Sequence, residues 1–450
     1  MPTIHAKTAL LPSGWVDNVI LTIAEGRIET IAPGTDGDTS VDILLPALAN
    51  LHSHAFQRAM AGLTEKRGPD ASDSFWTWRS LMYRFLDHLT PDDIQSIAAY
   101  VQLEMLQSGY AAVGEFHYLH HQPGGAPYDN LAELSDRIIA AAADTGIGLT
   151  HLPVLYMQGG CDGRPLGPGQ DRFGNSADRF AKLHEQCAKS LAHLPNDAML
   201  GMAPHSLRAV NKSALAHALP DHGPIHMHLA EQRAEVDEVL HTYGARPTEW
   251  ALDNLDVNER WCMIHATQMK PHETKGLAAT GAVAGLCPIT ESSLGDGIFD
   301  GVRWLDHQGR IGIGSDSNIR IACAEELRTL DYSQRLRDHT RAALATADKS
   351  TGRRLYDACA SGGAQALGRD AGTIEPGKWA DLVALDGDAT DLIGKSGDTL
   401  LDAWIFASDD RLVRHVWSAG RPVITEGRHP NHAKITDQYR ATLHRLGAIL

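Results

Sequence analysis

Residues 43–54 read Ile-Leu-Leu-Pro-Ala-Leu-Ala-Asn-Leu-His-Ser-His, an apolar run that ends in two alternate histidines, His52 and His54. The run predicts a buried strand, and side chains at positions i and i+2 of a strand point to the same side. Two imidazoles therefore leave one strand end in the same direction. Neutral imidazole nitrogens suit zinc and iron, so the pair predicts one side of a divalent-metal site. The chain has 24 histidines, so this pair needs support from the rest of the sequence.

Size and composition limit the class of protein. The chain has 450 residues, of which 43% are apolar and 21% charged, so it is long enough for a large core plus a smaller module and too apolar to be disordered. No apolar stretch approaches the roughly 20 residues that a membrane helix needs. The first residues lack a basic segment followed by an apolar one, so we expect no secretory signal and no membrane association.

The cysteines and the net charge limit the cellular compartment and the classes of binding partner that we expect. The six cysteines are scattered and include no Cys-x-x-Cys pair, which favours reduced thiols in a cytoplasmic protein. The formal net charge of −16 argues against nucleic acid as a partner, because binding to its backbone needs clustered lysine and arginine. A small acidic ligand remains compatible with this charge, since a local arginine pair can hold an anion inside an acidic protein.

Short apolar runs alternate with longer amphipathic segments through the middle of the chain. The run that ends at His52 is the first of eight predicted strands, and the others are residues 111–116, 148–155, 200–204, 224–228, 261–265, 282–287 and 310–315. Residues 91–109 and 130–145 are predicted to be helices. The alternation indicates a parallel α/β architecture, and the eight strands favour a (β/α)8 TIM-like barrel.

The two chain ends have a different pattern from the middle. Residues 4–31 alternate and contain turn signals, and residues 380–385 and 413–417 are also strand-like. We therefore expect both ends to build one small β-sandwich module. The predicted domains are residues 1–45 and 371–435 for the two parts of this module, 46–370 for the barrel and 436–450 for a C-terminal helix.

Polar side chains recur where the predicted barrel strands end, which is the face where barrel enzymes carry their chemistry. His228 ends a second His-x-His pair and is the third predicted metal ligand, and Asp316 follows the last predicted strand. Glu231, three residues after His228, can take a proton from metal-bound water and pass it on. His265 could bind the metal or hydrogen-bond to the attacking oxygen. His226 could support the site or be a satisfied core histidine.

Together these residues predict a hydrolytic metal centre. The predicted metal ligands are His52, His54, His228 and Asp316, and the predicted catalytic residues are Glu231, His265 and Asp316. A cation held in this way lowers the pKa of bound water toward neutrality, so a nucleophile is available at pH 7. A barrel that only binds a small acid, as a sensor or scaffold, would need neither the glutamate nor the aspartate.

The same residues resemble the amidohydrolase superfamily over nearly the whole chain, and residues 372–383 are similar to its return into a composite β-module. No strand-end lysine stands where binuclear members bridge two metals. The resemblance therefore implies the mononuclear deaminase branch, with one divalent ion per chain. Nitrogen and oxygen ligands favour Zn²⁺, with iron or nickel as alternatives. Within that branch, four motifs resemble the formimidoylglutamate deiminase family of histidine breakdown, namely residues 52–63, 75–79, 115–121 and 203–208.

This resemblance implies hydrolysis of N-formimidoyl-L-glutamate to N-formyl-L-glutamate and ammonia. It implies that Asp316 takes the proton of the attacking water, that His265 stabilises the developing oxygen, and that Glu231 protonates the departing nitrogen. Arginine presents a planar fork that suits the two substrate carboxylates. The predicted substrate-binding residues are Gln57, Arg79, Tyr118, His205 and Arg208. Arg79 could instead stack on a tryptophan of its own segment.

An alternative is another deaminase of this branch, acting on a purine, a pyrimidine or an adenosine derivative. Such an enzyme would use the same metal chemistry but would need an aromatic-lined pocket in place of the arginines. The motifs that contain Arg208 and Gln57 count against it. The resemblance also implies a homodimer.

Overall fold

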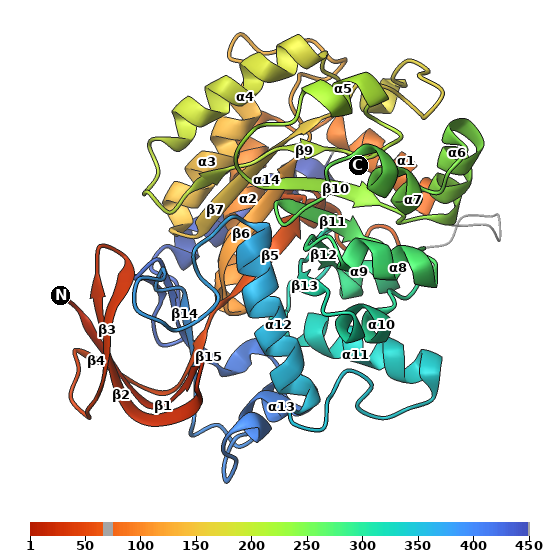
Figure 1. Ribbon diagram of the computed structural model, residues 1–450. Helices are drawn as coiled ribbons and strands as arrows, with labels where there is room; N and C mark the ends of the chain where they lie inside the picture. Colours follow the sequence, from red (N-terminus) through yellow and green to blue (C-terminus); the bar gives the residue numbers. More distant parts are fainter. Residues whose placement is uncertain (66–74, 449–450) are drawn as a thin grey trace.

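The computed structural model describes residues 1–65 and 75–448, and a barrel of parallel strands lies at its centre (Figure 1). All eight predicted barrel strands are present, and the (β/α)8 fold is confirmed. The fourth strand is split around Gly201, where the backbone runs close to Pro224. In chain order the barrel strands are β5 (Leu48–Ser53), β6 (Tyr110–His117), β7 (Gly148–Leu155), the pair β8 (Met199–Leu200) and β9 (Ala203–Pro204), β10 (Ile225–Leu229), β11 (Trp261–His265), β12 (Val283–Leu286) and β13 (Arg310–Ile313).

Two hydrogen-bonded sheets, β5 to β9 and β10 to β13, close into the barrel through two parallel bridges. One bridge joins β10 to the gap between β8 and β9, and the other joins Ser53 to Asp316. Gly314 allows the second closure, because a Cβ atom there would lie 2.8 Å from the backbone nitrogen and oxygen of His52. The closure therefore brings the end of the last strand beside the strand that carries His52.

Helices cover the outside of the barrel (Figure 1). They are α2 (Pro91–Gln107), α3 (Glu133–Thr145), α4 (Ala177–Leu191), α5 (Lys212–His217), α6 (Arg233–Tyr243), α7 (Pro247–Asn254), α8 (Pro271–Ala278), α9 (Pro288–Leu294), α10 (Gly301–Asp306), α11 (Cys323–Asp338) and α12 (Thr351–Ala366). Helix α2 begins with a reciprocal cap, in which Thr90 and Asp93 each accept a hydrogen bond from the backbone of the other. Helix α3 begins three residues later than predicted, because the side chain of Asn130 accepts from the N–H of Ala132 at 3.1 Å and forms a turn first.

Shorter elements and the C-terminal helix complete the fold. They are η1 (Ala55–Met60), α1 (Phe75–Leu86), η2 (Pro168–Gln170), α13 (Asp398–Ala407), η3 (Asp410–Leu412) and α14 (His432–Gly447). Helix α14 packs against α2, where the rings of Tyr100 and Tyr439 stack with 4.0 Å between their centroids. The C-terminal helix therefore lies against a barrel helix.

Both chain ends meet in one seven-stranded sheet, which confirms the composite β-module. The order β16-β15-β14-β4-β1-β2-β3 puts the C-terminal strand β14 antiparallel to the N-terminal strand β4. Buried side chains of both parts, such as Leu21, Leu382 and Trp417, share one apolar cluster. The strands are β1 (Thr3–Leu11), β2 (Gly14–Ala24), β3 (Arg27–Pro33), β4 (Thr39–Pro46), β14 (Leu382–Leu385), β15 (Val413–Ser418) and β16 (Arg421–Ile424). The domain boundaries stay a prediction.

A buried charge network fastens the β-module to the barrel. Arg369, which follows α12, donates hydrogen bonds to Asp381 at 2.9 Å and to Asp197 at 2.8 Å. Arg421 of β16 also donates to Asp197, at 2.7 Å. Asp197 precedes the barrel strand β8, and Asp381 precedes β14. Because buried charges are tolerated only when they are paired, this network requires the two parts to dock in one register.

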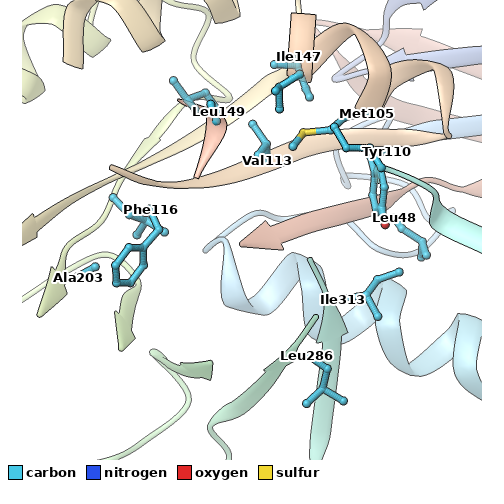
Figure 2. Packing of buried hydrophobic residues seen from close by; sticks show 14 of the residues in the cluster. Leu48, Met105, Tyr110, Val113, Phe116, Ile147, Leu149, Ala203, Leu286 and Ile313 are labelled. Carbon is cyan, nitrogen blue, oxygen red and sulfur yellow. The ribbon is translucent and has the colours of Figure 1, made fainter. Parts of the chain in front are cut away.

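Apolar side chains fill the layer between the barrel strands and the helices. Figure 2 shows Val113 of β6 and Leu149 of β7 in this layer together with Met105 of α2. A separate cluster contains Leu51 of β5 and Ile264 of β11, which are not neighbouring strands, so this cluster lies inside the barrel. All six cysteines are buried free thiols. Within the described ranges, no helix is long and apolar enough to cross a membrane.

Candidate metal centre and active site

The four predicted metal ligands meet at the mouth of the barrel. His52 and His54 come from the end of β5, His228 from β10, and Asp316 from the turn after β13. All four are buried, and each offers one ligand atom within 4.8 Å of the others. Oδ1 of Asp316 lies 3.4 Å from Nε2 of His52 and 3.3 Å from Nε2 of His54, and Nε2 of His228 lies 3.2 Å from Nε2 of His52.

The imidazoles are oriented and neutral, as metal ligands must be. Nδ1 of His54 donates to the carbonyl oxygen of Phe116 at 2.9 Å, and Nδ1 of His228 donates to that of His205 at 3.1 Å. A carbonyl can only accept, so the Nε2 atoms of both rings keep their lone pairs. Burial lowers the pKa of His52 to about 3 and lowers the pKa values of His54 and His228 as well.

The donor atoms therefore fit a divalent cation. Nε2 of His228 carries a lone pair and lies 3.2 Å from Nε2 of His52, so both nitrogens face the space that a cation would occupy. Ligand atoms about 2.0–2.2 Å from one cation lie roughly 3 Å or slightly more from their neighbouring ligand atoms. The observed separations of 3.2 to 3.4 Å match this spacing.

The turn that carries Asp316 is held by the barrel closure. The N–H of Asp316 donates to the carbonyl of His52, and the N–H of His54 donates to the carbonyl of Asp316, both at 2.9 Å. Beneath it, Asn50 donates to the hydroxyl of Ser315 at 2.7 Å. Burial alone would raise the pKa of Asp316, but the hydrogen bond from His52 and the nearby imidazoles lower it. Asp316 caps no helix, because α11 begins only at Cys323.

Strained backbone conformations occur at three of the strand ends. Ala230, His265 and Asp316 have positive φ angles of 51°, 69° and 46°. This region is unfavourable for residues with a Cβ atom and persists where the surroundings enforce it, as at functional sites. The strain lies where β10, β11 and β13 turn toward the metal ligands.

Glu231 follows β10 in a loop that is tied to its neighbours. Its N–H donates to Glu235 at 2.9 Å, and its carbonyl accepts from the hydroxyl of Thr267 at 2.8 Å. Burial raises the pKa of Glu231 to about 7, although the charge of His265 opposes the rise. A carboxyl group with this pKa can both accept and release a proton near neutral pH.

His265 lies between carboxylates on both sides of its ring. Nδ1 is 3.2 Å from Oε1 of Glu291 in α9, and Nε2 is 3.8 Å from Oδ2 of Asp316. Burial alone would lower its pKa, but the charges of Glu231, Glu291 and Asp316 raise it well above its ordinary value. Nδ1 of His265 lies beside Glu291, and His265 also forms a second group of possible ligand atoms with Cys287 and Asp316, so hydrogen bonding and metal binding both stay predictions for this residue.

One pocket contains every predicted substrate-binding residue together with three of the four predicted metal ligands, His54, His228 and Asp316. Nε2 of Gln57 donates to the hydroxyl of Tyr118 at 2.8 Å, and Tyr118 packs edge-on against His54. The predicted residues that line the pocket are His54, Gln57, Arg79, Tyr118, His205, Arg208, His228, Glu231, His265 and Asp316. The structure thus brings the predicted residues together, while their individual roles stay predictions.

Several pocket residues were missed by sequence reasoning. Trp78, Met82 and Tyr83 of α1, together with Tyr156, Phe173 and Leu294, also line the pocket. Tyr156 directly follows a predicted strand, so the strand-end rule that selected the histidines could have found it. Phe173 and Leu294 lie outside the strands, and the sequence carries no signal for them. Glu291, which faces His265, was missed for the same reason.

His226 takes no part in the metal cluster. Its Nε2 donates to the carbonyl oxygen of Ala366, at the end of α12, at 2.7 Å. Burial lowers its pKa to about 4, so the ring is neutral. Of the two alternatives for this residue, the structure favours a core histidine that is held by the backbone.

Residues 43–423 match the amidohydrolase family. This segment contains both His-x-His pairs, His265 and Asp316. The chain belongs to this family. Residues 1–40 match the N-terminal domain of the formimidoylglutamate deiminase HutF. The amidohydrolase is therefore a hydrolase that acts on C–N bonds, as predicted.

Similar proteins that match this chain over nearly its full length show which members of the family it resembles. The chain is 46% identical to a formimidoylglutamate deiminase from Pseudomonas aeruginosa, over 100% of both chains. A crystal structure of an amidohydrolase from Brucella melitensis has a TM-score of 0.95 at 45% identity, over 99% of this chain and 100% of that one. A zinc-bound adenosine deaminase from Xanthomonas campestris has a TM-score of 0.82 at 21% identity, over 99% and 98% of the chains, which shows a shared fold alone. These matches confirm the predicted relationship to formimidoylglutamate deiminases.

Proposed function

We propose that this amidohydrolase converts N-formimidoyl-L-glutamate and water to N-formyl-L-glutamate and ammonia, a step of histidine degradation. The observation that carries the proposal is that one pocket holds the acid–base residues Glu231 and His265 together with the two arginines Arg79 and Arg208. The acid–base residues suit an amidine carbon, and the arginines suit carboxylates. The 46% identity to a formimidoylglutamate deiminase supports the same assignment.

The pocket composition also separates this function from deamination of a ring. Aromatic residues line part of the pocket, as a purine or pyrimidine would need, but they stand beside two guanidinium groups. A neutral base carries no negative charge for the guanidinium groups to bind, whereas each carboxylate of an acidic substrate does. The acidic substrate therefore fits the pocket better than the alternative does.

The chemistry can be divided among the residues of the chain. His52, His54, His228 and Asp316 would hold a divalent cation, which would supply a water of lowered pKa as the nucleophile. Asp316 accepts a proton from the attacking water. His265 donates a hydrogen bond to the oxygen on which negative charge develops. The attacking water loses two protons as the carbon–oxygen double bond forms, and Glu231 delivers two protons to the formimidoyl nitrogen, which leaves as ammonia.

The finer parts of this proposal concern the metal, the location and the assembly. Three imidazoles and one carboxylate favour zinc as the single ion. The buried, reduced cysteines support a location in the cytoplasm. The homodimer rests on the family resemblance and stays a prediction.

We expect the purified protein to release ammonia from N-formimidoyl-L-glutamate, and chelation of the metal to abolish that release. Added Zn²⁺ should restore activity to the chelated protein, because the ligand cluster is built by the fold. Ammonia is measured by a coupled assay, with the metal content determined in parallel. Release of ammonia from a purine but not from the formimidoyl diacid would contradict the proposal.

Arg208→Ala is expected to raise KM for N-formimidoyl-L-glutamate by at least about 10-fold with a smaller effect on kcat. The guanidinium group would otherwise bind a substrate carboxylate in both the ground state and the transition state. Arg233→Ala is a matched control, because Arg233 is exposed at the start of α6, and its KM should be unchanged. An unmoved KM in the Arg208 variant would remove this residue from the substrate site.

A further inference from the structure

Tyr156 is a pocket residue that the proposed reaction has not used. It stands directly after barrel strand β7, at the face where the metal ligands lie, and lines the same pocket as Arg79 and Arg208. The residue is 1% exposed. Its ring contacts that of His205 edge-on, with 4.6 Å between the ring centroids. The phenol is therefore held in the wall of the pocket and cannot reorient toward solvent.

Two donors already occupy the oxygen of the Tyr156 hydroxyl group. An Nη atom of Arg79 donates to it at 3.0 Å, and Nε2 of Gln170 donates to it at 2.8 Å. The Gln170 amide cannot be turned round, because its Oε1 accepts from the N–H of Gly167 at 2.9 Å. A phenol oxygen has two lone pairs and one proton. Both lone pairs are therefore used, and the proton has to find an acceptor elsewhere.

Within residues 1–65 and 75–448, the hydroxyl group of Tyr156 has no partner other than these two donors. A buried hydroxyl proton without an acceptor is unfavourable, so the site is prepared for a ligand that brings one. The guanidinium groups of Arg79 and Arg208 in the same pocket favour an acceptor that is negatively charged. The ligand group that satisfies both conditions is a carboxylate.

We propose that Tyr156 donates a hydrogen bond to a carboxylate of the substrate and so selects for an acidic substrate. This inference rests on the proposed function, whose substrate carries two carboxylates. The arginines supply charge, which acts over a distance. The phenol adds a directional donor whose hydrogen bond is lost when the carboxylate is missing, and loss of such a bond discriminates strongly between substrates.

The direct test is Tyr156→Phe, which removes the hydroxyl group and keeps the ring. We expect KM for N-formimidoyl-L-glutamate to rise by about 10- to 100-fold, the range for one hydrogen bond to a charged group, with kcat changed by less than about 3-fold. Tyr356→Phe is the control, because Tyr356 of α12 is equally buried but donates to the carbonyl of Pro46 outside the pocket. The control should keep KM. An unchanged KM in Tyr156→Phe would overturn the inference.

Two analogues show whether the partner is a carboxylate. N-formimidoyl-4-aminobutanoate lacks the α-carboxylate, and N-formimidoyl-2-aminobutanoate lacks the side-chain carboxylate. Tyr156→Phe should still raise KM for the analogue that retains the carboxylate bound by the hydroxyl group. It should leave KM unchanged for the other analogue. An equal change in KM for both analogues would contradict a hydrogen bond from Tyr156 to a carboxylate.

A double-mutant cycle separates direct contact from an effect through Arg79. If Tyr156 only oriented that arginine, Tyr156→Phe would not raise KM further in the Arg79→Ala background, and the inference would fail. We expect most of the increase in KM caused by Tyr156→Phe to remain in that background. Should the wild-type protein release no ammonia, the proposed function fails. In that case, calorimetry compares the binding of N-formyl-L-glutamate to the wild-type protein and to Tyr156→Phe. Equal affinities, or no binding to either protein, would overturn the inference about Tyr156.

Discussion

Glu231→Gln is expected to lower kcat for ammonia release from N-formimidoyl-L-glutamate by about 10²- to 10⁴-fold while the metal stays bound. Glutamine keeps the size of the side chain and the backbone bonds to Glu235 and Thr267. It cannot carry a proton to the departing nitrogen. Glu231 is not part of the candidate metal cluster, so we expect the metal content to remain at one ion per chain.

The measurement combines kcat from the ammonia assay with metal analysis of the same sample. Glu185→Gln is the matched control, since Glu185 is an exposed residue of α4 paired with Lys189, and it should retain full activity. Substantial activity in Glu231→Gln would exclude this residue as the proton carrier. Loss of the metal along with activity would instead assign it a structural role.

Arg369→Leu is expected to lower the free energy of unfolding by about 3–5 kcal/mol. Leucine removes the positive charge between Asp197 and Asp381 and leaves both carboxylates buried, although Arg421 still reaches Asp197. Breaking a buried ion pair on one side costs more than the pair contributes, because the remaining charge loses its partner.

Urea unfolding at pH 7 measures the effect, and Arg440→Leu provides the control. Arg440 is an exposed residue of α14 whose pair with Asp437 should contribute about 1 kcal/mol or less. A loss below about 1 kcal/mol in the Arg369 variant would show that the network does not fasten the module to the barrel.

The pH dependence of this variant gives a second check. Burial alone would raise the pKa of Asp197, but the hydrogen bond from Arg421 and the charge of Arg369 lower it below its ordinary value. A depressed carboxyl pKa contributes stability above the unfolded value of about 3.9, and that contribution is lost as the pH falls through the folded value. The difference between wild type and Arg369→Leu should therefore be widest near neutral pH and shrink below about pH 4.

Most of the barrel could be predicted because its signals are local. Each barrel strand is a short apolar run, and the strand-end rule placed His52, His228 and Asp316 at one face before their distances were known. The start of α3 was placed too early, because the competing turn at Asn130 depends on a single side-chain hydrogen bond. Sequence periodicity does not resolve such a contact.

The parts of the site that could not be predicted depend on contacts between distant segments. Glu291 faces His265 only because α9 follows β12, which pairs with β11, and Gln170 reaches Tyr156 across a long loop. Neither contact leaves a pattern in the chain, since nothing in the local sequence records which loops meet.

The amino-acid sequence by itself predicted the barrel strands, the four residues of the candidate metal cluster and the residue types that suit an amidine and two carboxylates. Only the tertiary structure decided that β13 closes onto β5 at Gly314, that His226 faces Ala366 and that both lone pairs of Tyr156 are already used. The physical reason is the distance along the chain between the residues that interact. Strand formation depends on neighbours along the chain, whereas ligand spacing, burial and hydrogen-bond saturation depend on segments that meet only after the barrel has closed.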